Sequence, residues 1–312
     1  MQDSRMAVVG IGATGTVLAA VLLGKYPDTF LIGRTPDLGK TLDLKGIHVS
    51  GEITCKVAIK NYSSQIRALK DFRPSSIFLT TKTFHLEQVL DDLREVVESG
   101  TKIIASQNGL GPEDLVADRF GRDSALRMSL NYGASLKRAG EVEVTFFNRP
   151  NHLGSLSEAN QNLGLQLADR ISDCGLATEL VDDIKLFVWK KMIMKCTMAS
   201  ICAVTDKTIK EALEYPPTRQ IADACFKEAL AVARAMGYDL GEDYLQQAIG
   251  YLQKAGNHKD SMCNDIENKT PTEIDFLGAK VVEYAHANGI STPFYVTMTN
   301  LVKAIESNYL EK

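Results

Sequence analysis

Three glycines near the start of the chain have the spacing of a phosphate-binding turn. Gly10, Gly12 and Gly15 form the pattern GxGxxG within MAVVGIGATGTVLAAVLLG, after a short apolar run and before a run with helical spacing. In such a turn the first glycine permits the bend, the second lets a pyrophosphate approach, and the third lets helix and strand pack closely. Free N–H groups at the helix start then bind the phosphate. We predict a dinucleotide site formed by Gly10, Ile11, Gly12, Ala13, Thr14 and Gly15.

The residues after the second predicted strand bear on which dinucleotide is bound. NAD-binding proteins usually place an Asp or Glu there for the ribose hydroxyls, whereas this chain has Gly33, Arg34 and Thr35. A guanidinium pairs well with a 2′-phosphate. We therefore predict NADPH as the cofactor, with Arg34 on the 2′-phosphate. The alternatives are a solvated arginine, or NAD bound with the help of nearby Asp37.

Two more polar residues follow predicted strands. Lys82 ends the run FLTTK, and Asn108 lies in IIASQNGLG. Open α/β sheets bind ligands beyond the carboxyl ends of their strands. We expect Lys82 to contact the cofactor or a substrate carboxylate, and Asn108 to hold the nicotinamide or the reacting group. The simpler alternative is that both are turn residues, since Asn-Gly is a common turn dipeptide.

The elements that would position these residues fall into two regions. Strand-like and helix-like runs alternate up to about residue 180, which predicts βαβ units and a parallel sheet. From about Ile184 strand signals disappear and long helical stretches follow. The predicted fold class is α/β, with an N-terminal Rossmann-type NADP-binding domain at 1–180 and a C-terminal all-helical domain for substrate and dimerisation at 181–312. Strands are expected in AVVGIG, DTFLIGR, SSIFLTTK, TKIIASQNG, ALRMSLNYGASL and GEVEVTFFNRPNHLGSL, and a polar connector in KAGNHKDSMCNDIENKTP.

Composition argues against several other classes of protein. The chain has 312 residues and a formal net charge of −4, which is unlike a general nucleic-acid binder. No run of about 18 uncharged apolar residues predicts a membrane span, and no signal peptide is visible. The six cysteines form no CxxC pair and the histidines do not cluster with them. We expect reduced structural thiols, no metal site and a cytoplasmic protein.

Taken in order, these segments resemble the ketopantoate reductase family. The resemblance begins with the turn from Gly10 to Gly15, TTK at Lys82 and QNGLG at Asn108. It continues with WKK ending at Lys191, SMCND at Ser261 and TEIDFLGAKVVEYAHANGISTP from Thr272. The ordered set covers nearly the whole chain and is more specific than any one of its motifs.

The resemblance implies a Rossmann domain followed by a helical domain, with the active site in the cleft between them. It implies NADPH-dependent reduction of a 2-oxo acid to a 2-hydroxy acid, foremost 2-dehydropantoate to pantoate as in pantothenate biosynthesis. The family's catalytic lysine falls on Lys191 and its strand-end asparagine on Asn108. Its substrate-binding serine and glutamate fall on Ser261 and Glu273, and Lys82 matches a lysine of the first domain. A homodimer through the helical domain is a further expectation.

Lysine suits this chemistry, because ketone reduction needs an acid that protonates the forming alkoxide. The positive charge also stabilises that alkoxide. Lys195 lies four residues after Lys191, so in a helix the two ammonium groups share a face and repel each other. From the residues alone, partly solvated helix lysines are the alternative.

Glu273 also has a structural explanation. The run from Thr270 to Glu273 matches a capping box, with Thr270 as N-cap, Pro271 at the first helical position and Glu273 at the third. This pattern predicts a helix that begins at Pro271.

Two positions depart from the family pattern. Four and eight residues after the catalytic lysine the family usually carries asparagines, whereas this chain has Lys195 and Ala199. Lysine only donates and brings charge, and alanine removes a polar contact and opens space. We predict that Lys195 contacts the substrate, and that it pairs with an additional carboxylate. The alternatives are a related dehydrogenase for another, for example dicarboxylic, oxo acid, and a non-catalytic NADP(H)-sensing protein.

Overall fold

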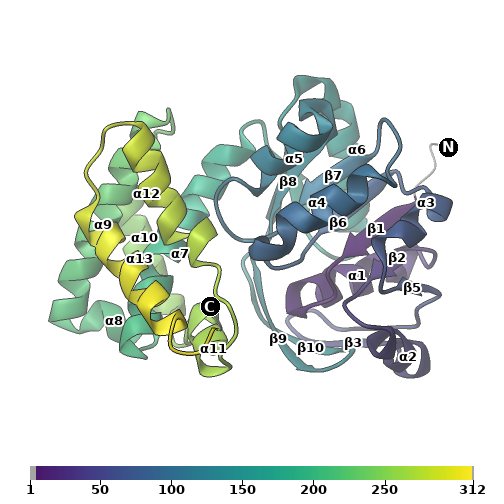
Figure 1. Ribbon diagram of the computed structural model, residues 1–312, viewed down its shortest axis with the longest axis horizontal. Helices are drawn as coiled ribbons and strands as arrows, with labels where there is room; N and C mark the ends of the chain where they lie inside the picture. The colour runs from purple at the N-terminus through teal and green to yellow at the C-terminus, as the bar shows by residue number, and fades with distance from the viewer. Residues whose placement is uncertain (1–4, 311–312) are drawn as a thin grey trace. The chain divides into compact units, whose positions relative to one another are not determined.

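The computed structural model describes residues 5–310, which divide into two compact units (Figure 1). The first contains residues up to Gln107 and Pro112–Ile184, and the second contains Asn108–Gly111 and the chain from Lys185 onward. This division lies near the boundary expected at residue 180. The short segment Asn108–Gly111 belongs to the second unit although the first unit surrounds it in sequence. The cofactor and substrate roles of the two parts stay predictions.

The first unit is built on an eight-stranded sheet in the order β12-β11-β8-β7-β6-β1-β2-β5. Neighbouring strands are parallel except for the antiparallel pair β8 and β11. The central strand β1 is buried along its whole length and pairs Val8 with Leu31 on one side and Phe78 on the other. These are the apolar runs of a sheet covered on both faces, so the predicted parallel-sheet fold is confirmed. The strands are β1 (Met6–Val9), β2 (Phe30–Ile32), β5 (Asn61–Ser63), β6 (Ser76–Leu79), β7 (Lys102–Ala105), β8 (Ala125–Ser129), β11 (Asn151–Ser155) and β12 (Thr178–Leu180).

A second, four-stranded sheet explains why the first helix is apolar on every side. Its order is β4 (Cys55–Val57), β3 (Ile47–Gly51), β10 (Glu141–Phe147) and β9 (Tyr132–Arg138), with β9 and β10 forming an antiparallel hairpin. Helix α1 (Ala13–Lys25) contacts β1 and all four of these strands. A helix enclosed on all sides needs no polar face. The sequence analysis did not foresee this sheet, because β3 and β4 are short and carry exposed polar side chains.

The remaining helices of the first unit flank the main sheet (Figure 1). Helix α4 buries Leu86, Val89, Leu90 and Leu93, the spacing of one helical face. It ends at Arg94. The helices are α2 (Pro36–Lys45), α3 (Leu69–Phe72), α4 (Leu86–Arg94), α5 (Pro112–Phe120) and α6 (Gln161–Asp173).

The second unit is helical, as predicted, and no strand occurs among its described residues. Trp189 fixes the long helix α7 in the core, because its ring lies 6.0 Å from those of Tyr238 and Tyr284. The predicted polar connector contains a helix, α11, that the sequence analysis had not separated from it. The helices are α7 (Ile184–Thr205), α8 (Ile209–Glu214), α9 (Pro216–Ala235), α10 (Tyr244–Ala255), α11 (Ser261–Glu267), α12 (Gly278–Ala287) and α13 (Pro293–Glu306).

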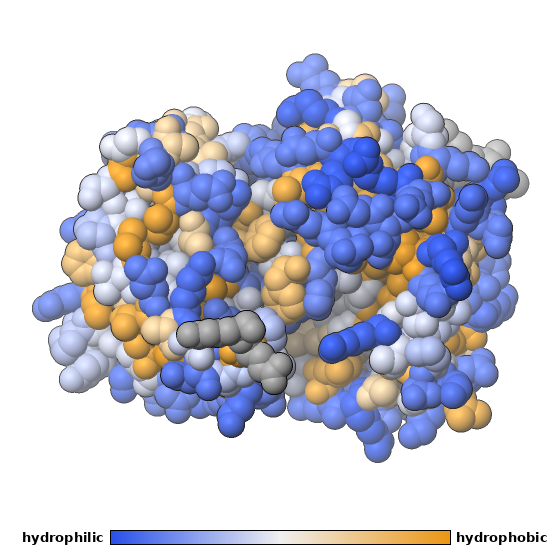
Figure 2. Space-filling model, in the orientation of Figure 1, coloured by the Kyte–Doolittle hydropathy of each residue, from blue (hydrophilic) through white to orange (hydrophobic). Residues whose placement is uncertain are grey.

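The helical unit exposes several apolar side chains. Helix α13 exposes Phe294, Val296 and Leu301. On the face that Figure 2 shows, the apolar side chains of this unit are scattered among hydrophilic ones. Within residues 5–310, every helix is too short or too polar to cross a membrane. A homodimer stays a prediction.

Candidate active site

The glycine turn joins β1 to α1, and its three glycines meet different surroundings. Gly10 has φ of +104°, and a Cβ there would lie 2.5 Å from the Thr81 nitrogen. A Cβ on Gly15 would lie 2.0 Å from the Gly10 carbonyl oxygen. A Cβ on Gly12 would meet nothing within 4 Å. Two glycines therefore serve conformation and packing, while the third leaves open space at the start of α1.

The open space lies at the positive end of a helix. Gly12 is the N-cap of α1 and provides no side-chain hydrogen bond. The first amide bonded within the helix is that of Thr16, which donates to the Gly12 carbonyl oxygen at 2.9 Å. The amides of Ala13, Thr14 and Gly15 precede it, and helix starts of this kind attract anions. The turn fits the pyrophosphate of a dinucleotide.

The segment after β2 is held by hydrogen bonds to its backbone. Burial raises the pKa of Tyr62, so its phenol stays protonated and donates to the Thr35 carbonyl oxygen at 2.7 Å. The Thr35 hydroxyl accepts from the Leu38 amide at 3.3 Å and caps α2. The backbone on either side of Arg34 is thus fixed.

Arg34 is exposed and has no carboxylate within 4.0 Å among the described residues. Asp37, the residue that would favour NAD, accepts a hydrogen bond from the Lys40 ammonium at 2.8 Å. The available charge beyond β2 is therefore positive, which suits a 2′-phosphate.

Lys82 lies just beyond β6, beside the glycine turn. Thr80, at the end of the same strand, donates from its hydroxyl to the Gly10 carbonyl oxygen at 2.7 Å. Lys82 is half-buried, and its carbonyl oxygen accepts from the His85 amide at 3.0 Å. This places Lys82 at the carboxyl end of the sheet, where a cofactor contact was expected.

The Asn108–Gly111 segment is held by elements of the second unit. The Gly109 amide donates to the Met192 sulfur at 3.1 Å. The Leu110 amide donates to the Phe276 carbonyl oxygen at 2.9 Å. These two contacts fix Asn108 between α7 and the 3₁₀ turn Ile274–Phe276.

Lys191 and Asn108 meet directly. The Lys191 ammonium donates to Asn108 Oδ1 at 2.9 Å, and both residues are half-buried. The bond spans 83 residues of sequence and joins α7 to the segment after β7. Two residues that sequence reasoning selected separately therefore lie together.

Lys195 lies one turn farther along α7, and its ammonium is bound by a residue that the sequence analysis did not select. It donates to Asp260 Oδ1 at 2.6 Å, to Asp260 Oδ2 at 2.7 Å and to Ser261 Oγ at 2.8 Å. The Lys195 and Asp260 side chains are only 16% and 7% exposed. An aspartate thus occupies the place at Lys195 that was predicted for a second substrate carboxylate.

A local signal for Asp260 was present in the sequence. An aspartate directly before a helical run is a strong N-cap, and Asp260 accepts from the Met262 amide at 2.9 Å at the start of α11. The signal was missed because α11 was taken as part of a polar connector. Its pairing with Lys195, 65 residues away, is not visible in the sequence.

The predicted helix start at Pro271 is wrong. Thr270 donates from its amide and its hydroxyl to the Asp265 carbonyl oxygen, at 2.9 and 3.1 Å, and so closes the end of α11. Glu273 instead precedes the 3₁₀ turn Ile274–Phe276, and α12 begins only at Gly278. Glu273 is half-buried, three residues from the carbonyl that binds Leu110. Ala199 is fully buried, so the space expected there is closed to solvent.

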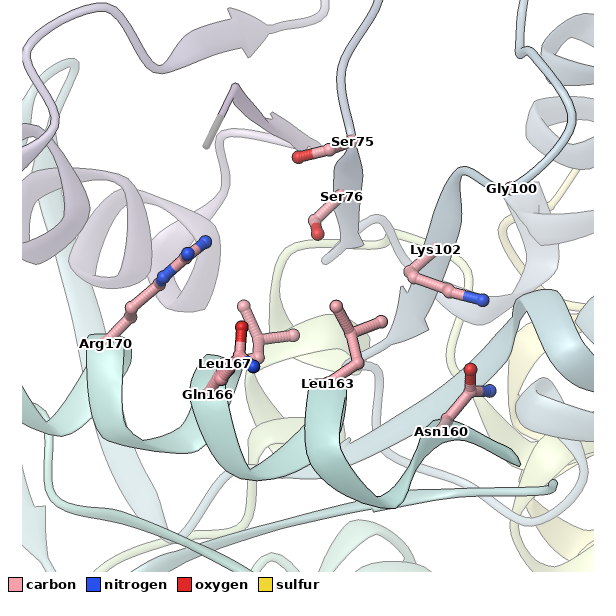
Figure 3. A pocket seen from close by; sticks show the side chains of 9 residues that line it. All are labelled: Ser75, Ser76, Gly100, Lys102, Asn160, Leu163, Gln166, Leu167 and Arg170. Carbon is pink, nitrogen blue, oxygen red and sulfur yellow. The ribbon is translucent and has the colours of Figure 1, made fainter. Parts of the chain in front are cut away.

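A separate hollow of about 360 Å³ lies elsewhere in the first unit (Figure 3). It is at the amino ends of β6 and β7, opposite the strand ends that carry Lys82 and lead to Asn108. Of the predicted site residues, none lines it. Across the described chain, no group of three or more His, Cys, Asp or Glu side chains could hold a metal, and the six cysteines are free. The lining residues are Ser75, Ser76, Gly100, Lys102, Asn160, Leu163, Gln166, Leu167 and Arg170.

Two family models match the chain. Residues 6–162 match the family described as ketopantoate reductase PanE/ApbA, and residues 183–306 match its C-terminal domain. Together the two matches span most of both units.

Whole-length comparisons agree with this match. The 2-dehydropantoate 2-reductase of Streptococcus pyogenes is 27% identical over 304 residues, covering 96% of this chain and 97% of that protein. The solved 2-dehydropantoate 2-reductase of Geobacter metallireducens superposes with a TM-score of 0.89 at 22% identity, covering 96% and 99% of the two chains. D-mandelate dehydrogenase with NADH and anilino(oxo)acetate superposes with a TM-score of 0.88 at 23% identity, covering 99% and 100%.

Proposed function

The chain belongs to the ketopantoate reductase family of oxidoreductases, and on that premise we propose that it reduces a 2-oxo acid to a 2-hydroxy acid with NADPH. The first candidate substrate is 2-dehydropantoate, named for the S. pyogenes relative. The observation that carries the proposal is the hydrogen bond of 2.9 Å between the Lys191 ammonium and Asn108. This bond holds the ammonium of Lys191, the proposed acid, which lies on α7, the longest helix of the second unit.

The chemistry assigned to Lys191 is proton transfer to oxygen. NADPH, when bound, supplies a hydride to the carbonyl carbon. As the carbonyl becomes an alkoxide, the positive charge of Lys191 stabilises the growing negative charge on oxygen. One N–H bond of the ammonium then breaks and an O–H bond forms, which leaves a neutral amine that solvent reprotonates. Asn108 keeps the nitrogen in place through its Oδ1 atom.

The cofactor assignment depends on the first unit. The glycine turn would hold the pyrophosphate at the start of α1, and Lys82 would contact the cofactor beside it. Arg34 would bind the 2′-phosphate, supported by its exposed charge and by the pairing of Asp37 with Lys40. The experiment that decides between cofactors is a comparison of Kd for NADPH and NADH.

The substrate assignment depends on the second unit. Ser261 and Glu273 would position the oxo acid, as the family pattern implies. Ser261 is exposed at the start of α11, with its oxygen bound by Lys195 at 2.8 Å. Synthesis of pantothenate and a cytoplasmic location stay predictions.

The test is NADPH oxidation with 2-dehydropantoate and a panel of other 2-oxo acids. We expect Lys191→Ala to lower kcat by a factor on the order of 100 or more, because it removes the general acid. Its Kd for NADPH should stay near that of the wild type. Lys190→Ala is the matched control, because the Lys190 ammonium lies over the Phe187 ring, 5.5 Å from its centre.

Two outcomes would contradict the proposal. Equal losses of turnover and NADPH affinity in Lys191→Ala would indicate a structural lysine. Tight NADPH binding without oxidation by any oxo acid would favour an NADP(H)-sensing protein instead.

A further inference from the structure

The ammonium of Lys195 is bound by Asp260 and Ser261. A lysine has three N–H donors and no acceptor. Lys195 makes three short contacts, at 2.6 and 2.7 Å to the two carboxylate oxygens of Asp260 and at 2.8 Å to Ser261 Oγ. Both charged side chains are largely buried. The pair therefore has no net charge.

This arrangement also sets the direction of the Ser261 hydrogen bond. Because lysine can only donate, Ser261 Oγ is the acceptor of the Lys195 contact. The serine O–H must then point elsewhere, and Ser261 is exposed. At the start of α11 a substrate would therefore meet a neutral hydroxyl donor, that of Ser261. The preceding residue, Asp260, carries a carboxylate.

We propose that Asp260 is a specificity-determining positioning residue that restricts the substrate to oxo acids with one carboxylate. The inference rests on the proposed reduction of 2-oxo acids. A second carboxylate beside Ser261 would approach the anion of Asp260, whose charge already neutralises the neighbouring cation of Lys195. A ligand carboxylate that finds no available cation in a poorly solvated place is disfavoured, and this is an effective source of specificity.

The same Asp260 has a structural role that must be separated from this one. Its Oδ1 atom accepts from the Met262 amide at 2.9 Å and caps α11. Asparagine and serine are also good N-caps. Asp260→Asn and Asp260→Ser therefore keep the cap while they remove the negative charge and release the charge of Lys195.

The test compares two acids that differ by one carboxylate, 2-oxopentanoate and 2-oxoglutarate. The wild type should prefer 2-oxopentanoate. In Asp260→Asn, the ratio of kcat/KM for 2-oxoglutarate to that for 2-oxopentanoate should rise at least about tenfold, the size of one close charge pair. Lys195→Asn combined with Asp260→Asn should return the ratio to near the wild-type value, because the released cation is gone. Asp260→Ser should repeat the result of Asp260→Asn.

The matched control is Asp206→Asn. Asp206 accepts from the Lys259 ammonium at 2.6 Å, but its side chain is 74% exposed. The same loss of one carboxylate there should leave the substrate ratio unchanged. This separates a local effect at Lys195 from a change in total charge.

Three results would overturn the inference. They are a wild type that prefers 2-oxoglutarate, an equal loss for both acids in Asp260→Asn, and a gain that persists when Lys195 is also replaced. If the wild type reduces no oxo acid, the proposed function fails separately. Calorimetric titration of the NADPH-loaded protein with both acids then decides the inference, since Asp260→Asn should still gain affinity for 2-oxoglutarate and an absent gain refutes it.

Discussion

The glycine turn allows a sharp prediction, because two glycines of one motif should fail in different ways when replaced by alanine. Gly15→Ala places a Cβ 2.0 Å from the Gly10 carbonyl oxygen and 2.4 Å from Thr80 Oγ1. Overpacking of this kind destabilises by about 1–3 kcal/mol, and the first clash is with backbone that cannot turn away. For a unit of this size, 2 kcal/mol lowers Tm by about 4 to 8 °C. Affinity for NADPH should fall only as far as the fold is disturbed.

Gly12→Ala should have the opposite profile. Its φ of −86° suits alanine, and the added methyl meets nothing within 4 Å. Loss of the preferred cap residue should lower the free energy of unfolding by less than about 1 kcal/mol. The methyl would occupy the proposed path of the pyrophosphate, so Kd for NADPH should rise about 10- to 100-fold, the equivalent of one charge-assisted hydrogen bond.

The assays are urea unfolding and titration with NADPH for each variant. Gly24→Ala is the control, since Gly24 lies in the same helix and a Cβ there also meets nothing within 4 Å. It should bind NADPH normally and be as stable as the wild type or slightly more so. Normal NADPH binding by Gly12→Ala, or greater loss of stability in Gly12→Ala than in Gly15→Ala, would refute the assignment of the open space to a phosphate.

Two other predictions concern the polar residues of the site. Asn108→Ala should lower kcat about 10- to 100-fold with little change in Kd for NADPH, because the Lys191 ammonium loses a hydrogen bond of 2.9 Å to a neutral acceptor; a steady-state and binding comparison checks this, and an unchanged kcat contradicts it. Arg34→Ala should weaken NADPH binding by about tenfold or more and leave NADH binding nearly unchanged, because only NADPH carries the phosphate that the guanidinium would bind; an equal loss for both cofactors in fluorescence titrations would count against it.

The parts of the fold that the sequence predicted well are those set by local pattern. The turn at Gly10 to Gly15 follows from its spacing and flanking runs, and the helical unit follows from sustained periodicity. The second sheet was missed because the pairing that joins its two halves, β3 with β10, spans nearly one hundred residues, as between Val49 and Val142. The helix start at Pro271 failed because Thr270 is bound to the end of α11 instead. A threonine that could cap the following helix can instead bond to the end of the preceding one, as Thr270 does to the Asp265 carbonyl oxygen.

The roles assigned to the site residues stay predictions, and only their positions can be compared with the structure. Lys191 and Asn108 were selected from motif order, and the structure brings them into contact. Asp260 was not selected, because the sequence shows an aspartate before a helix and not the lysine that it meets. The sequence therefore showed the positive charge of Lys195, but it did not show that Asp260 neutralises this charge.

Because Asn108–Gly111 belongs to the second unit, a single break in the chain cannot separate the two units. A fragment that began at Lys185 would retain Lys191 but lose the acceptor that binds it, and the complementary fragment would carry Asn108 on a segment without its anchors at Met192 and Phe276. One peptide bond joins Gln107 of the first unit to Asn108 of the second. Asn108, the acceptor of the Lys191 hydrogen bond, is thereby attached directly to the segment that follows β7.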